Sequence, residues 1–338
     1  MAIIAKFTRT LPAPSATISS GFVFLLSAGW FTQADTGAAG SPIDGGTNSL
    51  TNGGGDMKIF SDTATTTQLP IEVVSFVTGG SPVAQVWVRT PSYTAGDTIT
   101  IGKDDTQTVQ PAVGAAFGRN AAWSDSTLTT HLESTSAIDS SGNNATLTAG
   151  TGVSLVTDGL ALENGNAFDG TVDGKYTVTD NAVFDVNNLS VSVWVKPNST
   201  SPTNARILGK QGQYNFILRS NKLYCELWTV GGVKSFLDSF ILINGARYLV
   251  SIDYDGTDIR YYINGALSGV STVSGGNLSN SSDNLFIGSR GGASESLPAN
   301  LYDFTAKETS KSASWYSSVH NNQSDPDNFG TSSEYVLV

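Results

Sequence analysis

The chain has 338 residues, a formal net charge of −11 at pH 7, 14% charged residues and 39% hydrophobic residues. A nucleic-acid-binding protein needs a cationic surface that displaces counterions, so this acidic balance excludes that class and also disfavours contact with an anionic membrane. The length suits two domains, and 36 glycines with few charges favour a turn-rich all-β protein.

The N-terminal part predicts strands and long loops. Residues 22–31 form the longest apolar run, roughly half of the ~20 residues that a membrane-spanning helix needs, so they predict a buried strand. The first residues lack the basic-then-apolar order of a secretory signal, so we expect the protein to act where it is made or assembled; the alternative is that a leader was removed. Residues 35–56 predict a surface loop, and the Gly- and Ala-rich segment 111–123 predicts a domain boundary.

The C-terminal part alternates with period two, which is typical of strands. Residues 189–197 place valines on one face and Ser, Trp and Lys on the other. Asp255-Gly256 and Asn264-Gly265 are strong hairpin signals because both residues of each pair tolerate positive φ. They predict a three-stranded meander over 248–270, and residues 310–320 predict a short helix.

Cysteine and histidine offer little chemistry. Cys225 alternates with Leu223 and Leu227, which predicts a small apolar core residue, and a single cysteine excludes a disulfide within the chain. The two histidines have too few nearby ligands for a zinc site, so we interpret His131 as structural.

Three strand motifs follow one another in the first third of the chain. They are Gly-Gly-Asp-Met-Lys-Ile at 54–59, Leu-Pro-Ile-Glu at 69–72 and Val-Trp-Val-Arg-Thr-Pro at 86–91. In this order they resemble the bacterial domain of unknown function DUF2341. The aromatic turn usual in that family is replaced here by Gly-Lys-Asp-Asp at 102–105. The resemblance implies a β-sandwich domain over residues 1–118.

A second ordered series of motifs follows. Its members are His131–Glu133, Asp139–Asn143, Phe168–Gly170, Leu189–Pro197, Tyr262–Gly265 and His320–Pro326. Together they resemble the laminin-G/concanavalin A-like jelly roll. The resemblance implies that residues 119–338 form such a jelly roll, so the whole chain is expected to be all-β with two β-sandwich domains.

A calcium site is one interpretation of the loop 139–144. Calcium prefers carboxylate and amide oxygens that converge on a rigid loop, and Asp139 and Asn143 supply such groups. Similar jelly rolls often hold calcium at their rim with an Asp from the last core strand, for which Asp303 is the candidate. The alternative, equally supported, is an Asx-turn in which Asp139 only caps its own loop.

Sugar binding would use exposed aromatic rings beside amides. The candidates are Trp194, Trp228, Tyr224 and Tyr262, which alternate with aliphatic residues of their strands. One face of each strand in a sandwich is core, so packing is the alternative role for each ring. A sugar platform requires that two or three of them be exposed together.

The glutamates do not form the Glu-x-Asp-x-x-Glu array that presents two carboxylates to one sugar in glycoside hydrolases of this fold. We therefore expect no enzyme. The prediction is a bacteriophage virion structural protein (a fibre, tail or capsid-decoration component) whose lectin-like module contacts host-surface glycans. We expect it to be a homo-oligomer located in the virion beside other virion proteins, with no nucleic-acid partner and no membrane insertion.

Three alternatives remain open. The first is a secreted bacterial glycan-binding or adhesion protein, located extracellularly or at the bacterial cell surface. The second is a polysaccharide-degrading enzyme, and the third is a purely structural protein without a ligand.

Overall fold

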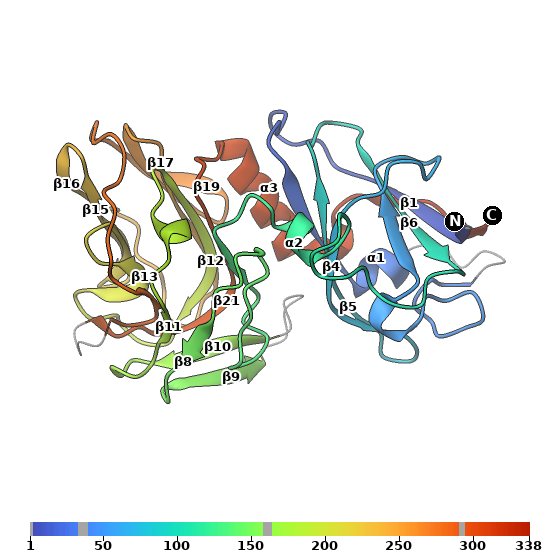
Figure 1. Ribbon diagram of the computed structural model, residues 1–338, viewed down its shortest axis with the longest axis horizontal. Coiled ribbons are helices and arrows are strands. Elements are labelled where there is room, and N and C mark those ends of the chain that lie inside the picture. The colour runs from blue at the N-terminus through green and yellow to red at the C-terminus, as the bar shows by residue number, and fades with distance from the viewer. Residues whose placement is uncertain (1–2, 33–39, 158–163, 291–294) are drawn as a thin grey trace. The chain divides into compact units, whose positions relative to one another are not determined.

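The computed structural model describes residues 3–32, 40–157, 164–290 and 295–338, and its fold is almost entirely β (Figure 1). The chain divides into two compact units. The first consists of residues 1–124 and 317–338, and the second of residues 125–316. The predicted all-β fold class is thus confirmed.

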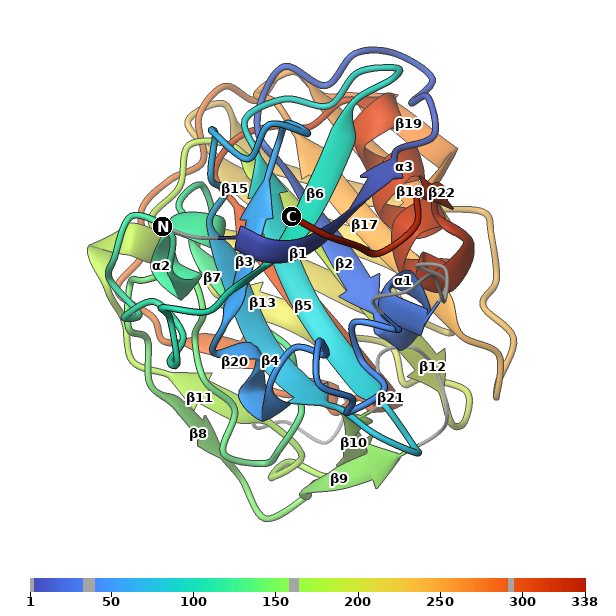
Figure 2. The same ribbon diagram turned by 90° about the vertical axis from the view of Figure 1, so that its right-hand side faces the viewer.

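The first unit contains two antiparallel sheets. One has the order β22-β1-β6-β3 with β23 also on β1, and the other has β5 between β2 and β4 (Figure 2). The strands are β1 (Ile3–Thr10), β2 (Phe22–Ser27), β3 (Met57–Phe60), β4 (Ile71–Val77), β5 (Val83–Thr90), β6 (Thr98–Asp104), β22 (Thr331–Ser332) and β23 (Val336–Leu337). The short helices of this unit are α1 (Ala28–Thr32), η1 (Asn52–Gly54), α2 (Arg119–Ala122) and η4 (Pro326–Asn328).

The second unit is built from one eight-stranded and one seven-stranded sheet. Their orders are β19-β18-β17-β12-β21-β10-β9, with β7 also on β21, and β16-β15-β14-β13-β20-β11-β8. The eight-stranded sheet contains β7 (Leu128–Thr130), β9 (Val153–Thr157), β10 (Asn164–Asp169), β12 (Leu189–Pro197), β17 (Tyr248–Tyr254), β18 (Asp258–Ile263), β19 (Ala266–Thr272) and β21 (Pro298–Lys307). The seven-stranded sheet contains β8 (Leu147–Ala149), β11 (Tyr176–Val178), β13 (Ala205–Lys210), β14 (Tyr214–Arg219), β15 (Lys222–Thr229), β16 (Gly232–Leu237) and β20 (Leu285–Ile287). A 3₁₀ turn, η2 (Ala182–Phe184), precedes β12.

The core of the second unit follows the period-two pattern. Val191, Val193 and Val195 of β12 are completely buried in one apolar cluster with Phe216 and Cys225 from the other sheet. Because successive side chains of a strand point to opposite faces, the residues between these positions lie on the outer faces of the two sheets. The prediction that Cys225 is a core residue is confirmed.

The predicted turns are present. β17, β18 and β19 form the meander, and Asn264 and Gly265 have positive φ of 51° and 75° between β18 and β19. The predicted helix is α3 (Ala313–Ser324), whose first residues belong to the second unit and whose remainder belongs to the first. Among the described helices, none has the length and apolarity required to span a membrane.

The prediction that residues 22–31 form one buried strand is wrong in its second half. The strand β2 ends at Ser27, and the apolar run continues as the helix α1. The start of this helix is held by Asp327, whose Oδ1 accepts hydrogen bonds from the Ser27 hydroxyl and, at 3.0 Å, from Gly29 N. A remote carboxylate thus satisfies a backbone donor that a helix leaves unpaired at its N-terminus.

The boundaries of the compact units differ from the predicted domain ranges 1–118 and 119–338, both at the division between them and at the C-terminal end. The division lies after Ser124, and the last 22 residues return to the first unit. They return because β22 and β23 hydrogen-bond to β1, with pairs such as Arg9 with Ser332 and Ala5 with Leu337. Sequence order alone does not report this pairing.

Candidate functional site

The carboxylate of Asp139 is occupied by backbone donors. Its Oδ1 accepts hydrogen bonds from Ser141 N at 2.8 Å and Thr129 N at 3.3 Å, and its Oδ2 accepts one from Ala145 N at 3.0 Å. These contacts close the loop from within, as the Asx-turn interpretation predicts. Asn143 donates its amide to Thr127 O at 2.9 Å and lines a polar hollow of about 210 Å³ with Asp180 and Asn181.

Asp303 has a separate partner. Its Oδ1 lies 2.7 Å from Nδ1 of the buried His131. It occupies a bulge of β21 where pairing with β12 shifts between Val193 and Trp194, and its φ is +30°. Within residues 3–32, 40–157, 164–290 and 295–338, no three His, Cys, Asp or Glu side chains gather to hold a metal ion. The calcium site stays a prediction.

The four candidate rings divide between two outer faces. Trp194 and Tyr262 project from the eight-stranded sheet, whereas Tyr224 and Trp228 project from β15 of the seven-stranded sheet. One sugar therefore cannot stack on all four rings. Trp194, Tyr224 and Tyr262 are buried, and Trp228 is half-buried.

Tyr262 packs in a polar corner of the second unit. Its ring stacks on that of Tyr316 with centroids 4.1 Å apart. The Tyr316 hydroxyl donates to Asp253 Oδ1 at 3.0 Å and lies 2.6 Å from the Ser190 hydroxyl. Burial raises the pKa of Asp253, and burial also raises the pKa of Tyr316. Neighbours hold both rings, so this corner stabilises the fold.

The outer side of β15 combines an aromatic ring with polar groups. Tyr224, Glu226 and Trp228 occupy alternate positions, and the exposed side chain of Val233 lies opposite Trp228 on β16. The Glu226 carboxylate accepts from the Tyr224 hydroxyl at 3.2 Å and from Asn215 Nδ2 at 3.3 Å.

Tyr224 is covered on one side. The Arg219 guanidinium lies 3.5 Å from the centroid of its ring, which is a cation–π contact. Of the four candidate rings, Trp228 therefore presents the most accessible surface for stacking.

The buried Gly209 of β13 lies beside these groups. Gly209 pairs with Asn215, and a methyl group added at Gly209 would meet Asn215 Oδ1 at 2.8 Å and Arg206 Nη1 at 2.9 Å. Among the described residues, these two atoms and Arg206 Nε are buried without a hydrogen-bond partner. Buried polar atoms are normally paired, so this unpaired acceptor and donor are unusual, and they lie beside a glycine that is itself buried.

We call the group formed by Arg206, Gly209, Asn215, Glu226 and Trp228 the β15 face; of these five, Glu226 and Trp228 are partly exposed and the others are buried. Sequence reasoning named Trp228 and Tyr224 but missed the other members. The alternation in 224–228 could have indicated Glu226. Nothing in the sequence indicates that Gly209, Asn215 and Glu226 lie in one cross-strand row.

The family comparison agrees with this architecture. Residues 169–316 match the family described as the concanavalin A-like lectin/glucanases superfamily (Laminin_G_3). Residues 169–316 form a concanavalin A-like domain. The β15 face belongs to this concanavalin A-like domain. The comparisons do not show the DUF2341 domain over residues 7–118, and no curated protein sequence matches the chain.

Solved structures of toxin binding domains resemble this chain over part of its length. The binding domain of Paraclostridial mosquitocidal protein 1 aligns with a TM-score of 0.50 and 16% identity, covering 58% of this chain and 52% of that structure. The alignment with the binding domain of botulinum neurotoxin serotype D covers 59% of this chain and 51% of that structure, with a TM-score of 0.48 and 19% identity. The alignment with the serotype G binding domain covers 58% of this chain and 50% of that structure, with the same TM-score and identity. The chain thus spans about half the length of the solved structures that it matches.

Proposed function

We propose that this protein is a glycan-binding protein and that the β15 face of its concanavalin A-like domain contacts a cell-surface sugar. The observation that carries the proposal is the half-buried ring of Trp228 beside the partly exposed Glu226, with the unpaired Asn215 Oδ1 and Arg206 Nη1 buried on the adjacent strands. Glu226, between Asn215 and Trp228, adds carboxylate oxygens to the same surface. Such a face offers a stacking surface, acceptors and donors at fixed positions.

The spacing suits more than one sugar ring. Gly209, Asn215 and Glu226 lie on three adjacent strands, so Gly209 and Glu226 are about 10 Å apart at the usual strand separation. Trp228 lies two residues beyond Glu226 on the same strand. One ring could stack on Trp228 while a hydroxyl of the next donates to the partly exposed Glu226 carboxylate.

A glycan array tests this function with the full chain. Trp228→Ala removes the stacking ring, and Gly209→Ala places a methyl group against the side chains of Asn215 and Arg206. We expect Trp228→Ala to bind at least about fivefold more weakly, because a lost aromatic contact costs about 1 kcal/mol or more. Gly209→Ala should also weaken binding, because its methyl group displaces Asn215 or Arg206. Phe240→Ala removes another exposed ring outside the face and is the matched control. The proposal fails if Trp228→Ala and Phe240→Ala bind the array like the wild type.

We also propose that the domain binds glycans without cleaving them. Hydrolysis of a glycosidic bond uses two carboxyl groups that flank it. Glu226 is the one carboxylate of β15, and the carboxylate of Glu295 forms an ion pair with Arg206 at 2.9 Å. Incubation with mixed polysaccharides should release no new reducing ends, and their release would overturn this proposal.

We propose that the protein is carried on bacteriophage particles as a fibre, tail or decoration component. A scarcely charged surface and a lectin-like domain after a first β unit support this role. Mass spectrometry of purified particles and immunogold labelling should detect the protein in the virion. Its recovery only from a bacterial culture medium or cell surface would favour the rival, a secreted adhesion protein.

We propose that two sheet edges of the second unit join copies of the chain into a homo-oligomer. Among the described strands, β16 pairs only with β15 and β19 only with β18, and both edges expose apolar side chains such as Val233 and Leu267. The Phe236 ring lies against Gly269, so the two edges are adjacent. Unpaired edges with apolar side chains favour association.

Light scattering after size-exclusion chromatography tests this assembly. Val233→Lys and Leu267→Lys should yield monomers, whereas Val77→Lys changes an exposed valine of the first unit and should leave the assembly intact. A monomeric wild-type protein at micromolar concentration would contradict the proposal.

A further inference from the structure

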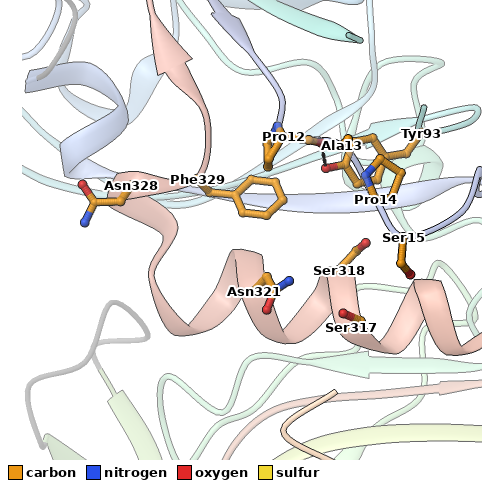
Figure 3. Close-up of a pocket in the computed structure, with 10 residues that line it drawn as sticks. All are labelled: Pro12, Ala13, Pro14, Ser15, Tyr93, Ser317, Ser318, Asn321, Asn328 and Phe329. Carbon is orange, nitrogen blue, oxygen red and sulfur yellow. Dashed lines mark hydrogen bonds between the residues drawn. The ribbon is translucent and has the colours of Figure 1, made fainter. Parts of the chain in front are cut away.

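The first unit contains a cavity of about 440 Å³ that none of the preceding functions uses. Three segments enclose it: Pro12–Ser15 after β1, Tyr93 after β5, and the end of α3 with the turn that follows it (Figure 3). Cavities that bind small molecules usually measure about 300–1,000 Å³. This cavity therefore has room for one small ligand.

Two aromatic rings line one side of the cavity, and both are almost fully buried. Tyr93 and Phe329 line the cavity with ring centroids 6.5 Å apart, and both pack on Phe24, at 5.0 Å and 6.0 Å. The Tyr93 hydroxyl donates to Pro12 O, which fixes the ring to the opposite segment (Figure 3). Burial, followed by the charge of Asp97, raises the pKa of Tyr93 to about 12, so the phenol stays neutral.

The helical wall is anchored independently. The Asn322 side chain accepts from Leu25 N at 2.7 Å and donates to Leu25 O at 3.0 Å. These two bonds hold the second half of α3 to β2 within the first unit. The neighbouring residues Ser318 and Asn321 also line the cavity, and Ser318 points from α3 towards the segment that contains Pro14 (Figure 3).

The polar lining consists of hydroxyl and amide groups. Ser15, Ser317, Ser318, Asn321 and Asn328 contribute them, and the ten lining residues include no charged side chain. Hydroxyls and amides both donate and accept hydrogen bonds, so they pair with alcohols. An ionic ligand would lose its hydration here without gaining an opposite charge. The lining thus selects a neutral ligand with hydroxyl groups and one apolar face.

We propose that this cavity binds a single neutral sugar ring, with its apolar face against Phe329 and its hydroxyls towards Ser318 and Asn321. This site lies in the first unit and is separate from the β15 face. The protein would then hold a glycan through two independent sites, each of modest affinity. Two linked sites bind one extended or repeated ligand more tightly than either alone.

Saturation-transfer NMR and calorimetry with the full chain test the proposal. The probes are the methyl glycosides of glucose, galactose, N-acetylglucosamine and rhamnose, with glucuronate and glucosamine as charged comparisons. Asn321→Trp places a large ring in the cavity from an exposed helix position, and Ser324→Trp adds the same ring to α3 outside it. We expect at least one neutral glycoside to bind, and to bind at least tenfold more weakly to Asn321→Trp while Ser324→Trp binds normally.

Three outcomes would overturn the proposal: no neutral glycoside binds, Asn321→Trp binds like the wild type, or a charged sugar binds more tightly than its neutral counterpart. Trp228→Ala separates this site from the β15 face, because that variant should keep the binding that Asn321→Trp loses. Loss of all binding in Trp228→Ala alone would assign the sugar to the β15 face instead.

Discussion

Replacing Asp139 with alanine tests whether its carboxylate closes the loop 139–145 by itself. The substitution leaves three backbone N–H groups without their acceptor, of which those of Thr129 and Ser141 belong to buried residues. An orphaned buried donor costs about 1–3 kcal/mol, and the bond to Thr129 is long at 3.3 Å. We therefore expect a loss of about 3 kcal/mol, or a Tm lower by roughly 6–12 °C for a domain of this size.

Differential scanning calorimetry measures this change, with Asp169→Ala as the control. Asp169 forms the same kind of turn by accepting from Thr171 N at 2.9 Å, but it is exposed, so water replaces the lost bond. We expect the control to lose about 1 kcal/mol or less.

Calcium separates the two interpretations of the loop. If Asp139 acts only through backbone donors, calcium and EDTA leave the Tm of the wild type unchanged. Two results together would refute the reasoning. In EDTA, Asp139→Ala would be no more destabilising than Asp169→Ala, and calcium would raise the Tm of the wild type but not that of Asp139→Ala.

Three further predictions concern acid stability, thiol reactivity and packing. Burial raises the pKa of Asp104, but hydrogen bonds led by that from Lys58 outweigh it and lower the pKa from 3.8 to about 2. The lowered pKa stabilises the fold above pH 3.8, and this stabilisation is lost as the pH falls towards 2. Asp104→Asn should therefore make the free energy of unfolding, measured in urea titrations, less dependent on pH across that interval. Burial raises the pKa of Cys225 to about 12, so iodoacetamide at pH 8 should label it only in denaturant. In Gly165→Ala the new methyl group meets the Tyr302 ring at 2.1 Å, which should lower the free energy of unfolding by about 1–3 kcal/mol in urea titrations.

Local patterns predicted much of the second unit. The pair Asn264-Gly265 indicated its hairpin because both positions require positive φ, a property that the residue types alone reveal. The prediction of a strand over all of residues 22–31 was wrong because a short apolar stretch is equally compatible with a strand and with a buried helix. The helix α1 is stabilised at its start by Asp327, nearly 300 residues away, which accepts a hydrogen bond from the backbone N–H of Gly29.

The candidate site was less predictable than the fold. Period-two alternation places Tyr224 and Trp228 on one side of β15, but it cannot tell whether an outer face is open or covered. Trp194 follows the same pattern and is buried. The position of Gly209 beside Asn215 depends on the register of β13 with β14, and strand partners are not encoded in periodicity.

The pairing of β1 with β22 and β23 affects how the protein is made. Residues 125–316 leave the ribosome before the strands that complete the sheet at β1. The segment containing Asn322, which secures α3 to β2, also emerges after the concanavalin A-like domain. Domains fold as units during synthesis, so that domain can finish folding while the unit that began first still waits for its last 22 residues.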